Sequence, residues 1–143
     1  MSDPIAFIIA DATRLFRARF DARIKSLGVT GPQWRVLLIA ARFPGITQRE
    51  AAMRLEVEPI TLSRKVDLLE QAGLIERRAV ANDRRARALY LTPQAAPLME
   101  ELRAQAIALM GEALDGLSTT EQAQFLDYAE RFRTNLSRRN TKS

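Results

Sequence analysis

Apolar positions recur at steps of three and four residues along most of the chain, which predicts a mainly helical protein. The first series follows Asp3-Pro4, a capping residue with proline at the first helical position, and it stops at Gly28. Its members are Ile5, Ile8, Ile9, Ala12, Phe16, Phe20, Ile24 and Leu27. We therefore expect one long amphipathic helix over residues 4–27.

Capping signals divide the rest of the chain. Three residue pairs fit the capping box, in which a hydroxyl and a carboxyl or amide three positions later satisfy free backbone N–H groups. They are Thr30 with Gln33, Thr47 with Glu50, and Ser118 with Glu121. Thr92-Pro93 predicts a further helix start and Gly73 a helix end. Helices are expected over residues 31–42, 48–55, 59–72, 93–115 and 119–138.

Two short runs, residues 74–80 and 87–92, predict strands joined by a tight loop. Arg84, Arg85 and Arg87 then sit on the tip of a hairpin, where charge is hard to bury, so they face water or a partner. Strands this short have no core of their own and must pack on the helices. The predicted fold class is mainly α with a small β-hairpin (α+β), in a single domain spanning residues 1–143.

The segment before the hairpin has the helix-turn-helix pattern, two short helices separated by LEVEP, with Pro59 opening the second. A helical step places Ile60 and Arg64 nearly opposite the apolar stripe of that second helix. The stripe is expected to be Leu62, Val66 and Leu69.

Such a helix enters the DNA major groove with its first residues nearest the base edges. Arg64 is suited to a forked contact with guanine, Ile60 to a thymine methyl, and Thr61 or Ser63 to bases or phosphates. The alternative is that Arg64 is a solvated surface residue and that Ile60 packs beneath a loop.

Composition narrows the possible chemistry. The 143 residues carry a net charge of +5, with no histidine and no cysteine. The charge favours a polyanionic partner, although the arginine-rich composition also suits a GC-rich genome. Without His or Cys, the usual catalytic triads, Cys/His zinc sites and disulfides are excluded. Glu100 and Glu101 are adjacent on one predicted helix and point in different directions, so they do not form a catalytic acid pair. We expect no enzymatic activity and no cofactor.

Membrane insertion and export are not expected. No apolar run reaches the roughly 18 residues of a membrane span, and the N-terminus lacks the basic region of a signal peptide. The predicted location is the cytoplasm.

Residues 30–100 resemble the MarR family of bacterial transcription regulators, and within it the SlyA-like branch. The resemblance is carried by LEVEPITLSRKVDLLEQAGLIERR and by NDRRARALYLTPQA, in which Asp83, Arg85, Leu91 and Thr92 fill the family's wing pattern. It implies a winged helix-turn-helix lobe over residues 30–92. It also implies that the helices of residues 4–27 and 93–138 interlock two subunits.

The same resemblance assigns roles to the wing. Arg85 would enter the minor groove, Asp83 would hold it in place, and Arg84 and Arg87 would bind phosphates. The full set of predicted DNA contacts is Thr47, Gln48, Ile60, Thr61, Ser63, Arg64, Lys65, Arg84, Arg85 and Arg87.

The function so implied is a sequence-specific regulator of transcription, a repressor, that binds a pseudo-palindromic site in double-stranded DNA as a homodimer. The alternative is a winged helix used only as a protein-interaction module, in which the exposed arginines have no role.

Many members of the family release DNA on binding small aromatic carboxylates between the dimerisation helices and the winged lobe. By that resemblance the effector site would use Arg14, Phe16, Arg17 and Trp34, since an aromatic face beside a guanidinium suits an aryl acid. Trp34 could instead belong to the core and Arg14 to the solvated surface. The lack of cysteine excludes the peroxide-sensing thiol mechanism of one branch.

The two C-terminal helices have more apolar surface than one small lobe covers, which predicts a dimer. The alternative is an intramolecular three-helix bundle. The positions concerned are Leu98, Leu102, Leu109, Ala113, Leu117, Phe125, Ala129, Phe132 and Leu136.

Overall fold

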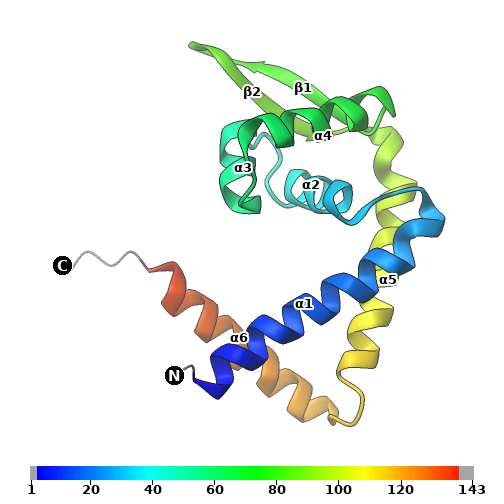
Figure 1. The fold of residues 1–143 in the computed structure, drawn as a ribbon, viewed down its shortest axis with the longest axis vertical. Coiled ribbons are helices and arrows are strands. Elements are labelled where there is room, and N and C mark those ends of the chain that lie inside the picture. The colour runs from blue at the N-terminus through cyan, green and yellow to red at the C-terminus, as the bar shows by residue number, and fades with distance from the viewer. Residues whose placement is uncertain (1–2, 139–143) are drawn as a thin grey trace. The chain divides into compact units, whose positions relative to one another are not determined.

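A computed structural model describes residues 3–138 of the chain (Figure 1). The elements in chain order are α1 (Pro4–Ile24), the 3-10 helix η1 (Lys25–Leu27), α2 (Gly31–Arg42), α3 (Gln48–Leu55), α4 (Pro59–Gln71), β1 (Ile75–Val80), β2 (Asp83–Leu91), the 3-10 helix η2 (Pro93–Ala95), α5 (Ala96–Ala113) and α6 (Thr119–Ser137). The predicted fold class, mainly α with one β-hairpin, is confirmed. None of the helices between residues 3 and 138 is both long and apolar enough to cross a membrane.

The helix starts follow local capping chemistry. Thr30, Thr47 and Ser118 each accept from the backbone N–H three residues on, and the Gln or Glu there accepts in return from the capping residue's N–H. All three predicted capping boxes are therefore present. The first helix differs slightly from the prediction, because its last turn tightens into η1 before Gly28 closes it at φ 77°.

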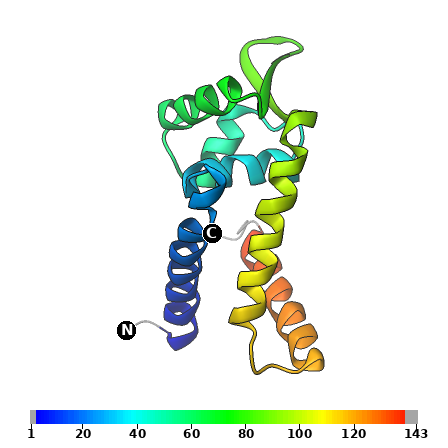
Figure 2. The same cartoon turned by 90° about the vertical axis from the view of Figure 1, so that its right-hand side faces the viewer.

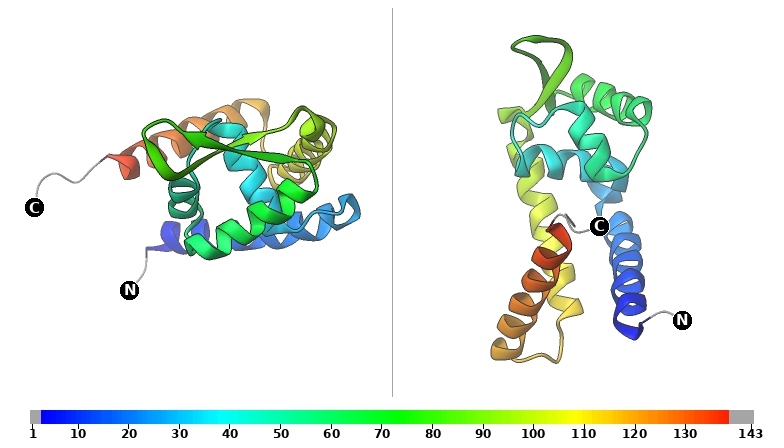
Figure 3. Two further views of the ribbon diagram at one scale, coloured as in Figure 1. Left: turned by 90° about the horizontal axis from the view of Figure 1, so that it is seen from above. Right: turned by 90° about the vertical axis from the view of Figure 1, so that its left-hand side faces the viewer.

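The chain divides into two compact units, residues 1–107 and 108–143. The first unit contains a core that joins α2, α4, the hairpin and the first part of α5. Its most deeply buried large side chains are Ile24, Leu37, Leu62, Val66, Ile75, Leu89 and Leu102. Within this unit, the hairpin and α4 lie at one end (Figures 1 and 3).

The hairpin is tied to the helix-turn-helix by a third extended segment. Thr47 forms a bridge with Ala88 of β2, and the Leu89 N–H donates to the Ile46 carbonyl at 2.8 Å. Gly45 in turn donates to the Leu89 carbonyl at 2.9 Å. Since residues 45–47 lead directly into α3, the hairpin cannot shift without moving the start of that helix.

The predicted boundary of the second strand is wrong. We expected it over residues 87–92, but β2 begins at Asp83, because Asn82 adopts φ 66° and turns the chain directly after Val80. Ladder pairing runs from Ile75 opposite Leu91 to Ala79 opposite Arg87 and is interrupted by a bulge before the tip.

Helix α1 buries only the C-terminal end of its apolar series. Phe20 and Ile24 are buried, whereas Ile5, Phe7 and Ile8 are more than 60% exposed. Within the first unit, Figure 2 shows α1 leading away from the lobe as a single helix. Its N-terminal half therefore has an apolar face without a covering element in that unit.

The second unit contains the end of α5 and all of α6. Leu109 of α5 is buried, but α6 buries none of its residues. Phe125, Tyr128, Phe132 and Leu136 recur on successive turns of α6, and each is at least 44% exposed. This spacing places them along one stripe of the helix.

Candidate nucleic-acid interface

The two helices of the predicted helix-turn-helix, α3 and α4, are joined by residues 56–58. Glu56 adopts the left-handed conformation at φ 56°, which turns the chain sharply after α3. The Val57 N–H closes this turn by donating to the Ala52 carbonyl at 3.0 Å. Pro59 then opens α4, as expected for a residue without an N–H to satisfy.

The predicted buried stripe of α4 is confirmed, with Leu62, Val66 and Leu69 at most 3% exposed. On the other side of the helix, Ile60 is 62% exposed and Arg64 is also exposed. An apolar side chain and a guanidinium are thus presented to solvent near the start of α4, the part of such a helix that contacts base edges in helix-turn-helix proteins.

Not all the polar residues predicted to contact DNA are presented in this way. Thr61 is exposed, whereas Thr47, Gln48, Ser63 and Lys65 are half-buried. The Thr47 hydroxyl caps α3, where it accepts from the Glu50 N–H at 3.1 Å. Its side chain therefore has a local structural role.

The β1–β2 hairpin forms the wing, and at its tip three residues of β2 stand outside the ladder. Val80 pairs with Asp83 and the adjacent Ala79 pairs with Arg87, so residues 84–86 have no Cα partners on β1. The Asp83 carboxylate closes this bulge, because its Oδ1 accepts from the Arg85 N–H at 3.1 Å and the Ala86 N–H at 3.2 Å. Asp83 thereby fixes the backbone that carries the arginines.

The three wing arginines differ in their surroundings. Arg87 Nη1 donates to the Arg84 carbonyl at 3.0 Å and to the Ala86 carbonyl at 2.9 Å. Its guanidinium therefore helps to hold the bulge. The side chains of Arg84 and Arg85 are exposed at the tip.

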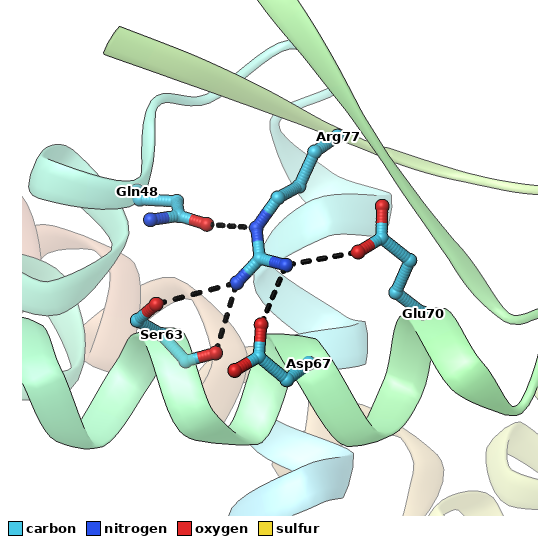
Figure 4. A network of polar contacts seen from close by, with 5 residues as sticks. All are labelled: Gln48, Ser63, Asp67, Glu70 and Arg77. Atoms are coloured by element: carbon cyan, nitrogen blue, oxygen red, sulfur yellow. Dashed lines mark hydrogen bonds and ion pairs between the residues drawn. The ribbon is translucent and has the colours of Figure 1, made fainter. Parts of the chain in front are cut away.

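Sequence reasoning missed Arg77, the central residue of a polar network that joins the wing to both helices (Figure 4). Its side chain, on β1, is only 16% exposed. It contacts Gln48 at the start of α3 and three residues of α4, Ser63, Asp67 and Glu70. No sequence periodicity predicts this network, because its members lie up to 29 positions apart.

A cavity of about 310 Å³ opens between α1, α2 and the helix-turn-helix. Three cationic side chains line it, Arg17, Arg35 and Lys65, one each from α1, α2 and α4. The other lining residues are Pro32, Val36, Leu55, Val57, Thr61 and Leu62. Its walls thus combine positive charge with apolar surface.

Of the four predicted effector residues, only Arg17 lines this cavity. Arg14 Nη2 lies 2.7 Å from Asp11 Oδ1 on the exposed side of α1. Phe16 stacks on Phe20, whose ring is also 5.4 Å from the Trp34 ring. The aromatic side chains therefore form part of the packing of α1 on α2, while Arg35 and Lys65 line the cavity without having been predicted.

Arg35 is held in the cavity wall by a partly buried carboxylate. Its Nη1 lies 3.5 Å from Asp21 Oδ1, which is buried and has no hydrogen bond within the described residues. A Cβ at Gly31 would overlap the Asp21 carboxyl group, so glycine at this position leaves room for the carboxylate where it lies.

A helix-turn-helix followed by an antiparallel hairpin whose arginine-bearing tip is exposed defines a winged helix protein. A profile of the MarR family matches residues 27–86. The chain is 39% identical to the transcriptional regulator PA3341, over 94% of this chain and 99% of that one, with a TM-score of 0.78. It belongs to the MarR family.

Two further solved structures have the same fold. The transcriptional regulator SlyA is 27% identical, with a TM-score of 0.77 over 94% of this chain and 95% of that one. A MarR family regulator from Listeria monocytogenes, solved with a 26mer DNA, is 22% identical and has a TM-score of 0.78 over 95% and 90% of the two chains. At that identity the second match supports the fold alone.

Proposed function

We propose that the protein is a transcriptional regulator, a repressor, that binds a specific pseudo-palindromic site in double-stranded DNA as a homodimer. The observation that carries the proposal is the pairing of two exposed basic features at one end of the lobe. Arg64 lies on the outer face of α4, and Arg84 and Arg85 lie on the wing. Helix and wing then serve the major groove and the flanking minor groove, respectively.

The solved relative with bound DNA supports this reading, because its fold is the same. The assignment to the SlyA-like branch remains part of the proposal, as does a cytoplasmic location, which follows from a chromosomal partner. Expression from a reporter promoter that carries the selected site, with and without the protein, tests repression.

A selection experiment tests specific binding. The full-length protein is incubated with random duplexes, bound DNA is sequenced over several rounds, and Kd is measured on the selected and on a scrambled duplex at matched salt. We expect a two-fold symmetric site bound about 10³-fold or more tightly than the scrambled duplex. Equal Kd values on the two duplexes would favour the alternative, a winged helix used only for protein interaction.

The homodimer rests on exposed apolar surface. Ile5, Phe7 and Ile8 of α1, and Phe125 and Phe132 of α6, are all exposed in the isolated chain. Such faces on two terminal helices favour association with a second copy over a solvated monomer. A two-fold dimer would also present two α4 helices to successive turns of the major groove.

For an effector, we propose the cavity between α1, α2 and α4 as the site, with a small aromatic carboxylate as the ligand. Arg17, Arg35 and Lys65 supply charge for the carboxylate, and Val36 and Leu55 supply apolar surface for a ring. Lys65 and Thr61 belong to α4, so a ligand here would compete directly with DNA contacts.

Calorimetric titration with benzoate and 2-hydroxybenzoate tests the effector site. We expect binding that is weakened about tenfold in Arg17→Gln, the size of one lost charged hydrogen bond. The control is Arg14→Gln, an exposed arginine on the same helix that does not line the cavity. Equal weakening in both variants, or no binding of either acid, would contradict the proposed pocket.

A further inference from the structure

All three guanidinium nitrogens of Arg77 have partners within the protein (Figure 4). Nε donates to Gln48 Oε1, Nη2 donates to the Ser63 carbonyl at 2.9 Å and faces the Ser63 hydroxyl at 3.3 Å, and Nη1 donates to Glu70 Oε1 at 2.9 Å. Nη1 also lies 2.7 Å from Asp67 Oδ1. The guanidinium of Arg77 is thus engaged by four hydrogen bonds and two ion pairs inside the protein.

These contacts join three elements of the first unit. Arg77 lies on β1, Gln48 is the first residue of α3, and Ser63, Asp67 and Glu70 follow one another along α4. The planar fork of the guanidinium fixes direction as well as distance, which an ammonium group does not do. The network therefore holds the wing, the start of α3 and α4 at one relative orientation.

The network also uses two side chains that the sequence had assigned to DNA. The Gln48 amide oxygen and the Ser63 hydroxyl both face Arg77. Asp67 and Glu70, with side chains 54% and 44% exposed, would repel phosphates if their charge were not matched. Arg77 thus offsets negative charge on α4 and at the same time directs its neighbours inward.

We propose that Arg77 is a positioning residue for DNA recognition, one that holds α4 and the wing at the separation and angle that a single binding site requires. This inference rests on the proposed sequence-specific DNA binding. It predicts that loss of Arg77 lowers the preference for the selected site far more than it lowers binding to DNA in general.

The test compares Arg77→Gln with Arg78→Gln, the neighbouring arginine of the same strand. Arg78 bonds Glu76 and stacks 4.0 Å above the Tyr90 ring, so its loss removes the same charge without touching α3 or α4. Kd is measured for both variants and for the wild type on the selected and scrambled duplexes. We expect Arg77→Gln to lose about tenfold or more on the selected duplex and about threefold on the scrambled one, with Arg78→Gln losing similar small factors on both.

A variant that also lacks the two carboxylates separates positioning from electrostatics. Asp67→Asn/Glu70→Gln/Arg77→Gln removes two negative charges and one positive charge, so it is more positive than the wild type by one. If Arg77 acted only by offsetting the carboxylates, this variant would regain wild-type affinity and preference, and the inference would be overturned. We expect it to bind scrambled DNA at least as well as the wild type while the preference stays low.

Stability is controlled in the same experiment by melting each variant and measuring Kd well below its midpoint. Arg77→Lys is the second variant and is used if Arg77→Gln does not fold. We expect it to fold and still lose its preference for the selected duplex, because an ammonium group lacks the planar fork of a guanidinium. If the wild-type protein bound the selected and scrambled duplexes equally, the proposed function itself would be overturned. A wild type that discriminates, with a folded Arg77 variant that discriminates equally, would overturn this inference alone.

Discussion

At the scale of single residues, the arginines of this lobe differ in their surroundings, although all of them carry the same guanidinium group. Arg77 and Arg87 direct their guanidinium groups at the protein's own backbone and side chains. Arg64 and Arg85 are exposed. Exposure alone does not distinguish a base contact from a phosphate contact, but the two contacts respond differently to DNA sequence and to salt.

Arg64→Ala is expected to weaken binding to the selected site by about 1–3 kcal/mol and to relax discrimination at one base pair of each half-site. The physical reason is the loss of a forked contact to a base edge in the major groove. The measurement is Kd on the selected site and on its single-base variants. Arg103→Ala, which removes an exposed charge from α5, is the control; equal losses on selected and random DNA would mean that Arg64 meets only phosphate.

Arg85→Ala is expected to weaken binding most on sites with A·T-rich flanks, where a narrow minor groove concentrates negative potential. Arg85→Lys should restore little, since the ammonium is more strongly hydrated and has no fork. Kd is measured against salt on A·T-flanked and G·C-flanked sites.

Arg84→Ala is the matched control for Arg85, as the neighbouring residue of the same bulge. It should lower affinity alike on both flanks and reduce the salt slope by about one unit. The sequence predicted the same behaviour for Arg87, but Arg87→Ala would also remove two bonds that hold the wing backbone. An identical loss on both flanks for Arg85→Ala would show that the wing acts only as an electrostatic clamp.

At the scale of elements, the turn between α3 and α4 sets the direction of α4 relative to α3. Glu56 holds the left-handed conformation there, which costs an ordinary residue about 1–2 kcal/mol and a β-branched residue more. Glu58, two residues later, is extended at φ −66° and ψ 144°. The same substitution should therefore destabilise the protein at position 56 but not at position 58.

Glu56→Val is expected to lower the free energy of unfolding by about 1–2 kcal/mol, whereas Glu58→Val should leave it nearly unchanged. Both variants lose one carboxylate and gain the same side chain, so the comparison isolates backbone strain. Urea titration followed by circular dichroism gives the two values. Equal destabilisation would indicate that the carboxylates, and not the conformation of Glu56, determine the effect.

Local chemistry explains which elements could be predicted from sequence. Thr30, Thr47 and Ser118 cap their helices through bonds to residues three positions away, so the signal lies within one turn. The start of β2 was missed because it depends on the left-handed turn at Asn82 and on a bulge across the ladder. The register of such a pair depends on both strands together, so the sequence of one strand does not determine it.

In the candidate site, too, the local features could be predicted from sequence, whereas contacts between distant elements could not. The exposure of Ile60 and Arg64 follows from the helical period, and both are exposed. The network of Arg77 and the meeting of Arg17, Arg35 and Lys65 around one cavity arise from packing between elements distant in sequence. Such groups converge only after the fold has formed, so no spacing rule locates them.

At the scale of the whole molecule, the proposed function depends on a second copy of the chain. The exposed stripe of α6 includes Phe125, Tyr128, Phe132 and Leu136. We therefore expect light scattering to give about twice the 16.1 kDa mass of one chain.

Phe132→Asp should dissociate the dimer or unfold it, because it places a charge within an apolar contact surface. Gln124→Asp is the control, a new carboxylate at an exposed polar position of the same helix, and it should leave the dimer intact. Sedimentation and circular dichroism distinguish a folded monomer from an unfolded chain. A wild-type monomer that binds a full palindrome tightly would contradict the proposed assembly.

The bulge at the wing tip also bears on how members of such a family diverge. Arg84, Arg85 and Ala86 have no ladder partners, so a replacement or an added residue there leaves Ile75–Ala79 in register with Arg87–Leu91. The pairing of β1 with β2 therefore does not depend on the residues at the tip of the hairpin. Under the proposed minor-groove role of Arg85, substitutions at these three positions would change the preference for flanking DNA without altering the register of the strands.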